Sequence, residues 1–181
     1  MAIALAAGVL SACGSGPAPA AAKSSASTTA APGPAEDFKA TAADFTNIHD
    51  MTQVRGFFVD NKSGHLSEAV AMAEANKGGV YPVGTILQLV PQEAMVKRRK
   101  GWNSATKDWE FFFLDVSKDG TKIVTRGADK VENRFGMNCS SCHQAAESKF
   151  DMVCENDHGC EPLPIDHKVI EGIQRADPRP Q

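Results

Sequence analysis

The sequence predicts an α+β fold made mainly of an antiparallel β-sheet with flanking helices. Short apolar runs bounded by turn residues indicate strands, and Asp119-Gly120 between two such runs is a strong hairpin signal. Further stretches carry apolar residues at helical spacing. A sheet of about four or five antiparallel strands is expected. The 181 residues, 42% hydrophobic and 23% charged, fit one soluble domain with or without a tail.

The elements follow one another without an internal repeat. Apolar residues at helical spacing predict a helix over 36–50, a second from Leu66 to Ala73 that ends at 76–79, and a short C-terminal one through Ile170 that ends at Asp177-Pro178. Apolar runs predict strands at 54–59, 80–91, 94–100 and 108–117, followed by a strand partner after Gly120.

The first 35 residues differ from the rest of the chain. Residues 1–12 are apolar and small, as in a secretory signal peptide, and Leu10-Ser11-Ala12-Cys13 resembles the lipobox of bacterial lipoproteins. Cys13 is then expected to carry the lipid that anchors a periplasmic protein; the alternative is an ordinary signal cut near Ala12. Residues 13–35 are almost wholly small residues and proline, which predicts a disordered tether before a domain at 36–181.

Charge and export restrict the partners and the state of the cysteines. A formal net charge of −3 argues against nucleic acid, because phosphate binding requires a basic face. The mature chain has no apolar run long enough to span a membrane, so contact with one is expected through the lipid only. Beyond the membrane thiols are oxidised, so the remaining cysteines should be paired or chemically occupied.

Cys139, Cys142 and His143 form the motif Cys-x-x-Cys-His. On a helix these positions share one face, from which two thioether bonds can hold the vinyl groups of a haem while the imidazole binds its iron. We therefore expect one covalent haem c on a C-terminal haem-binding helix. Three alternatives remain: a zinc site completed by residues of the following loop, a thioredoxin-like redox pair, and a plain disulfide between the two cysteines.

Cys154 and Cys160 are the two remaining cysteines of the domain. If the haem occupies the first two, these form an even pair and are expected to make a disulfide. Such a short loop contributes about 2.4 kcal/mol by the chain-entropy relation. His158 lies between them and is expected at the surface, with ligation of zinc as the alternative.

The runs YPVGTILQLV and DWEFFFLDVSKDGT, followed by NCSSCH, resemble cytochrome P-460 and its relative cytochrome c′-beta over residues 50–165. The resemblance implies a largely antiparallel β fold, often a homodimer. It also implies one covalent haem whose iron is bound on one side only, by His143, with a distal pocket for gaseous or small nitrogen-containing ligands.

The sixth position of the iron decides the chemistry. Met152 is the only methionine after the motif and is the candidate for a second protein ligand. The resemblance implies either a lysine cross-linked to the porphyrin with an arginine nearby, or phenylalanines that cap the iron. Lys97 and Arg55 are the catalytic candidates for the first case; the alternative is that 97–100 form a solvated charged run.

Three functions follow from these alternatives. The leading hypothesis is an exported single-haem cytochrome with a five-coordinate iron that binds a small ligand such as nitric oxide and exchanges electrons with a redox partner protein. The second is a hydroxylamine-oxidising enzyme with a haem cross-linked to lysine. The third is an electron carrier with a sixth protein ligand.

Overall fold

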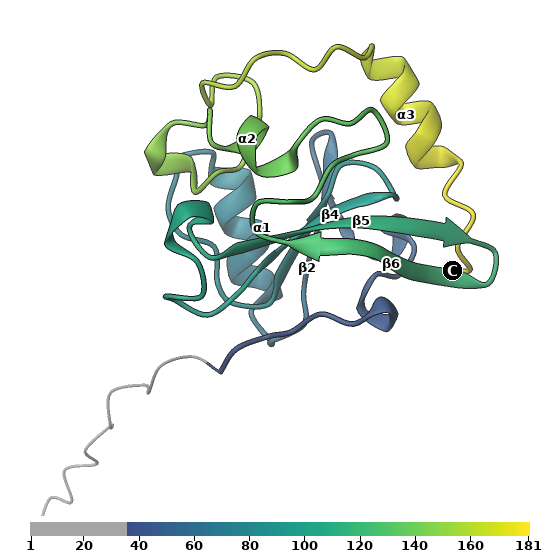
Figure 1. Cartoon of the computed structure of the whole chain (residues 1–181), viewed down its shortest axis with the longest axis horizontal. Coiled ribbons are helices and arrows are strands. Elements are labelled where there is room, and N and C mark those ends of the chain that lie inside the picture. Colours follow the sequence, from purple (N-terminus) through teal and green to yellow (C-terminus); the bar gives the residue numbers. More distant parts are fainter. Residues whose placement is uncertain (1–35) are drawn as a thin grey trace, which may run out of the picture. The chain divides into compact units, whose positions relative to one another are not determined.

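A six-stranded antiparallel sheet forms the centre of the molecule (Figure 1). The computed structural model describes residues 36–181; the predicted signal peptide, Cys13 and the tether lie outside this range. The strands pair in chain order: β1 (Thr52–Val54), β2 (Phe57–Asn61), β3 (Thr85–Gln88), β4 (Glu93–Lys97), β5 (Trp109–Ser117) and β6 (Gly120–Gly127). The mainly antiparallel α+β fold is thereby confirmed, with six strands rather than four or five.

Within residues 36–181, three α-helices and four 3₁₀ turns accompany the sheet. They are α1 (Leu66–Ala75), α2 (Cys139–His143) and α3 (His167–Arg175), with η1 (Ala42–Asp44), η2 (Ile48–Asp50), η3 (Ser104–Thr106) and η4 (Ser148–Phe150). The helices predicted from Leu66 and through Ile170 are confirmed as α1 and α3. None of the helices within residues 36–181 is long and apolar enough to cross a membrane.

The hairpin predicted at Asp119-Gly120 joins β5 to β6. Ser117 pairs with Gly120, so Lys118 and Asp119 form the connecting turn. Gly120 has a φ of 111°, a conformation that residues with a side chain rarely adopt. The hairpin prediction is therefore confirmed.

The sheet has two covered faces, which we name after the segments that lie on them. The α2 face buries a core that α1 and the segment after α2 join, and it includes Val59, Leu87, Met95, Trp109 and Phe111. The η1 face buries a second core against the segment before β1, and it includes Phe45, Ile86, Val96, Phe112 and Leu114. Because side chains alternate along a strand, neighbouring residues of β4 and β5 serve opposite faces.

The helix predicted over 36–50 is wrong. Of helical structure the segment carries only η1 and η2, separated by the non-helical residues 45–47. Thr41 and Asp44 bond to each other's backbone, and the Asn47 side chain accepts from the amide of His49. These local bonds compete with helix formation. Phe45 and Ile48 are nevertheless buried, so the prediction was right about which apolar residues face the core and wrong about the helical backbone.

The single strand predicted at 54–59 is also wrong. The chain reverses at Arg55 and Gly56, and Val54 pairs with Phe57 across the turn, so the stretch is the tip of the β1–β2 hairpin. Arg55 adopts a left-handed φ of 52°, which is rare for a residue with a long side chain. Gly56 is the one turn residue in this stretch, and it marks the reversal.

Candidate functional site

Helix α2 presents the predicted motif on a single turn. The side chain of Asn138 caps its start by accepting from the amide of Ser141 (3.0 Å), and the amide of Cys139 donates to the carbonyl of Val131 (3.0 Å). Neither Cys139 nor Cys142 is in a disulfide; the first is half-buried and the second exposed. Positions one turn apart share a face, so both thiols and the imidazole of His143 project from one side of the helix.

The orientation of His143 leaves one ring nitrogen free. Its Nδ1 donates to the carbonyl of Met152 (2.7 Å), and its ring packs against Phe111 with centroids 5.2 Å apart. A carbonyl can only accept, so Nδ1 carries the proton and Nε2 carries a lone pair. Burial lowers the pKa of His143, which keeps the imidazole neutral near pH 7. This is the form and the nitrogen that bind a metal.

The thiol of Cys139 has low reactivity in its folded environment. Burial, with a smaller contribution from the carboxylate of Glu93, raises the pKa of Cys139 to about 11. The thiol therefore stays protonated near pH 7 and is a poor nucleophile toward disulfides. This argues against the thioredoxin-like alternative, as does the antiparallel sheet, which contains no parallel strand pair within the described residues.

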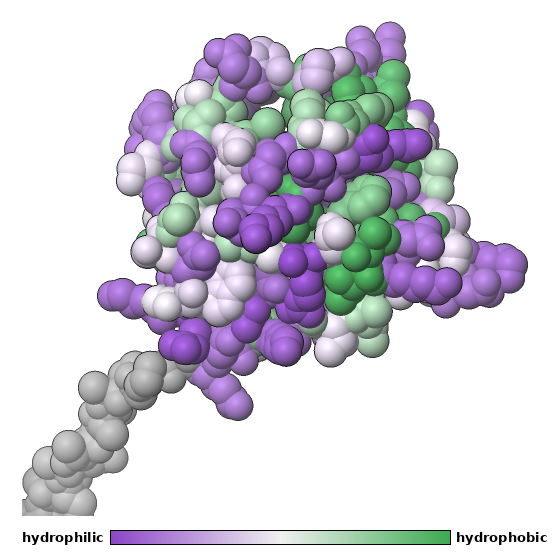
Figure 2. All heavy atoms as spheres, viewed as in Figure 1, coloured by the Kyte–Doolittle hydropathy of each residue, from purple (hydrophilic) through white to green (hydrophobic). Residues whose placement is uncertain are grey.

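A hollow of about 430 Å³ lies over β5 and β6, and its walls include Phe113, Val124 and Arg134. Figure 2 shows hydrophobic side chains at the surface over these two strands and again over α3. Glu93 lies opposite Phe113 in the β-ladder, and its carboxylate contributes to the raised pKa of the Cys139 thiol. The volume lies within the range of pockets for small organic molecules, roughly 300–1,000 Å³.

The loop after α2 holds the second cysteine pair. Cys154 and Cys160 are joined by a disulfide with Cα atoms 5.7 Å apart, the pairing that the sequence predicts. His158 is buried, contrary to expectation: its ring stacks on Phe150 with centroids 3.6 Å apart. Its Nδ1 donates to the carbonyl of Val153 (2.6 Å) and its Nε2 contacts the side-chain amide of Asn76.

These contacts remove the ligands that a zinc site would need. The loop would complete the site with Cys154, His158 or Cys160, but the two cysteines are bonded to each other and His158 has both ring nitrogens engaged. Among residues 36–181, no cluster of three or more histidine, cysteine, aspartate or glutamate side chains is arranged to hold a metal ion. The geometry of the described residues therefore disfavours the zinc alternative.

Lys97 is buried rather than solvated. Only 3% of the residue is exposed, and its Nζ donates to both carboxylate oxygens of Asp151 (2.7 and 2.8 Å) and to the carbonyl of Lys107 (2.7 Å). Arg98 is buried as well, between Asp37 and Glu110. Only Arg99 and Lys100 are exposed, so the interpretation of 97–100 as a solvated run is wrong for its first half.

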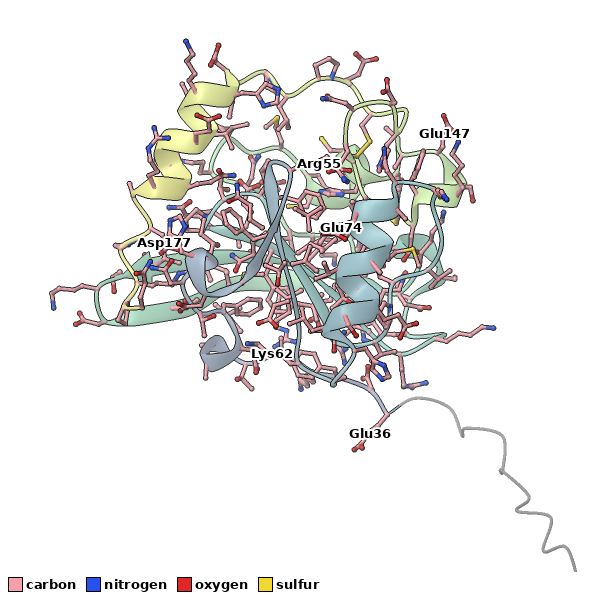
Figure 3. The ribbon with its side chains drawn as sticks, turned by 180° about the vertical axis from the view of Figure 1, so that it is seen from behind. Glu36, Arg55, Lys62, Glu74, Glu147 and Asp177 are labelled. Atoms are coloured by element: carbon pink, nitrogen blue, oxygen red, sulfur yellow. A yellow bond between two sulfur atoms is a disulfide. The ribbon has the colours of Figure 1, made fainter. Side chains whose placement is uncertain are left out.

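Arg55 is engaged with the disulfide loop. Figure 3 labels it at the tip of the β1–β2 hairpin, where its guanidinium pairs with Glu155 and donates to the carbonyl of Ala73 (2.8 Å). Its side chain remains 44% exposed. None of these contacts involves α2 or the residues of the hollow, so the geometry gives Arg55 a structural role at a loop.

The side chain of Met152 lies in the core, whereas its backbone carbonyl contacts the site. The residue is 3% exposed and packs in the core of the α2 face, while its carbonyl accepts a hydrogen bond from His143. The carbonyl sits on the Nδ1 side of the ring, whereas an iron on Nε2 would sit on the other side. This arrangement disfavours Met152 as a second ligand.

Asp151 and Glu93 are site residues that the sequence analysis missed. Asp151 belongs to an unremarkable stretch between the motif and Cys154, and Glu93 stands at a strand start. Burial raises the pKa of both carboxyl groups; Lys97 opposes the shift at Asp151 and Arg134 the shift at Glu93. No local pattern marks either residue, because their partners come from other elements.

In comparisons with known proteins, no protein-family model, curated protein or solved structure matches the chain.

Proposed function

We propose that this protein is an exported c-type cytochrome that carries one haem on Cys139 and Cys142, with His143 as the only protein ligand of the iron. We further propose that it binds a small ligand such as nitric oxide at the open position. The observation that carries the proposal is the imidazole of His143, neutral, fixed by Met152 through Nδ1 and free at Nε2, beside two unpaired thiols.

The donor set fits the group. Two thiols and an imidazole lie on one helical turn, and four of the five cysteines fall into two clear pairs within the described residues, one free and one oxidised. We propose that the flat ring lies against the hollow over β5 and β6, whose lining includes the apolar Phe113 and Val124 and the cation of Arg134 for an acidic substituent.

An open sixth position of the iron is supported by the contacts of the other side chains that could bind it. The Met152 side chain is packed in the core, and both nitrogens of His158 are engaged. When bound, the haem would supply an iron able to take up a diatomic or small nitrogenous ligand. The protein's own residues would orient the imidazole, exclude water with Phe111 and Phe113, and place the titratable Glu93 near the site.

The hydroxylamine-oxidising alternative finds less support. Attack on a porphyrin requires a neutral amine, whereas the Lys97 ammonium is held by three hydrogen bonds, two of them to a carboxylate. Burial lowers the pKa of Lys97, but the Asp151 carboxylate opposes this shift. The plain electron carrier requires a second protein ligand, for which Met152 is badly placed.

For the location and the partners we keep the proposals made from the sequence. The Cys154–Cys160 disulfide is typical of an oxidising compartment, which agrees with a periplasmic protein anchored through Cys13. A redox partner protein is needed to reduce or oxidise the iron, and a homodimer remains part of the proposal on the resemblance alone.

The test is the absorption spectrum of the reduced protein before and after addition of nitric oxide. We expect a high-spin ferrous spectrum that changes on addition, and no haem at all in the Cys139→Ser/Cys142→Ser variant. A low-spin six-coordinate iron that ignores nitric oxide would refute the proposed ligand binding. A strongly red-shifted ferrous Soret band that the Lys97→Met variant loses would favour the cross-linked enzyme instead.

A further inference from the structure

The segment after α2 makes a turn that presents one carbonyl to His143. Asp151 and Met152 are consecutive residues with left-handed φ values of 53° and 65°. The left-handed conformation is unfavourable for a residue other than glycine, so the turn persists only if its surroundings hold it. The turn places the carbonyl oxygen of Met152 2.7 Å from Nδ1 of His143.

Asp151 is tied down from three directions. Its carboxylate accepts two hydrogen bonds from Nζ of Lys97 on β4 and one from the amide of Tyr81 (3.0 Å). Its carbonyl accepts from the indole Nε1 of Trp109 on β5 (2.6 Å). Lys97 and Trp109 face each other across the β4–β5 ladder, so the rigid sheet is what the turn is fastened to.

We infer that Lys97 and Asp151 are positioning residues for the axial imidazole: their buried ion pair fixes the turn whose carbonyl orients His143 and draws electron density toward Nε2. Neither residue contacts the iron or its ligand. The inference rests on the proposed function, and it extends that function by assigning the Lys97 candidate a role on the His143 side of the haem.

This hydrogen bond would affect the midpoint potential of the iron and the strength of its bond to His143. A hydrogen bond from Nδ1–H to a carbonyl makes the imidazole a stronger donor and stabilises the ferric state. If the turn loosens, the bond lengthens. The midpoint potential should then rise, and the iron–histidine stretching frequency of the ferrous protein should fall.

The experiment compares Asp151→Asn with the wild-type holoprotein. Asparagine has nearly the same shape and tolerates the left-handed region, so the turn keeps its local fit while the ion pair with Lys97 is lost. We expect a higher midpoint potential and a lower iron–histidine frequency. Trp109→Phe removes the second fastening and should shift both quantities in the same direction by less; it decides the matter if Asp151→Asn does not retain haem.

The matched control is Glu110→Gln, which breaks the buried pair with Arg98 on the η1 face. Glu110 is about as buried as Lys97, and its side-chain hydrogen bonds go to Arg98 and Arg126 on the other face of the sheet. We expect this variant to lose stability while its potential and iron–histidine frequency match the wild type. Equal shifts in the control and in Asp151→Asn, or no shift in Asp151→Asn and Trp109→Phe, would overturn the inference.

Failure of the inference is distinct from failure of the proposed function. A wild-type protein without haem refutes the function. A wild-type protein with haem, whose potential and iron–histidine frequency ignore the turn, refutes only the role of Lys97 and Asp151.

Discussion

The two faces of the sheet each bury an ion pair, and the two basic residues are neighbours in the chain. On the α2 face Lys97 binds Asp151, and on the η1 face Arg98 binds Glu110 and Asp37. A buried pair gains little stability in itself because both charges lose their hydration. What each pair holds therefore matters more than its strength.

The pairs hold different segments. Arg98 fastens the start of the domain, since Asp37 accepts from its Nη2 (2.6 Å) and from the amide of Arg99 (3.0 Å). Lys97 fastens the turn that carries the Met152 carbonyl to His143. Changes on the η1 face should thus alter stability alone, whereas changes on the α2 face should alter stability and the properties of the site.

The largest expected effect comes from adjacent phenylalanines on opposite faces. Phe112 contacts Phe45 with ring centroids 4.9 Å apart, and Phe111 contacts His143. Phe111→Ala and Phe112→Ala should each lower the free energy of unfolding by about 3–5 kcal/mol, measured with denaturant. Only Phe111→Ala should also change the ferrous spectrum. Identical spectral changes in both variants would contradict the claim that only the α2 face affects the site.

A smaller loss is expected from the disulfide. Cys154→Ser/Cys160→Ser should lower the free energy of unfolding by about 2.4 kcal/mol, because the unfolded chain gains freedom. Haem content should not change, since the proposed attachment would use the other two cysteines. The measurement is unfolding under oxidising conditions, with reduced wild type as control. A variant that exports and folds but carries no haem would show that the loop takes part in attachment.

The Asp37 pair gives a pH dependence. The hydrogen bond from Arg98 lowers the pKa of Asp37 below its ordinary value. Ionised Asp37 therefore stabilises the fold above the unfolded pKa near 4, and this contribution disappears as the pH falls through the lower folded value. Asp37→Asn should cost up to about 1 kcal/mol at pH 7, since the pair is partly exposed.

Unfolding of Asp37→Asn and wild type at pH 7 and pH 3 measures this dependence. The difference between the two proteins should shrink at the lower pH. A difference that stays constant would show that the carboxylate charge does not contribute.

The smallest effect is expected at Arg55. Its pair with Glu155 is exposed, so Arg55→Gln should lower the free energy of unfolding by about 0.5 kcal/mol. Nitric oxide binding should be unchanged, because no contact links Arg55 to α2. The affinity for nitric oxide measures this directly. A large fall in affinity would return Arg55 to the site.

Local patterns predicted the elements whose signals are local. The Asp119-Gly120 hairpin, the helix from Leu66 and the Cys154–Cys160 pairing each depend on residues close in sequence. The helix predicted over 36–50 does not form because local side-chain bonds interrupt it and a distant partner holds it: the amide of Ile48 donates to Asp177, labelled near the C-terminal end in Figure 3.

The site divides in the same way. Cys139, Cys142 and His143 stand out by spacing alone. Asp151 does not, because its role arises only when β4 and β5 bring Lys97 and Trp109 to it. The basic run at 97–100 gave no sign that its first two members are buried, since burial is set by the carboxylates that the fold supplies.

The most direct measurement is the intact mass of the purified exported protein together with its absorbance after denaturation. Thioether bonds survive unfolding, so one haem should remain attached to the wild-type chain, and none to Cys139→Ser/Cys142→Ser. A wild-type chain whose mass includes no tetrapyrrole, and whose denatured solution is colourless, would contradict the proposal that α2 holds a haem.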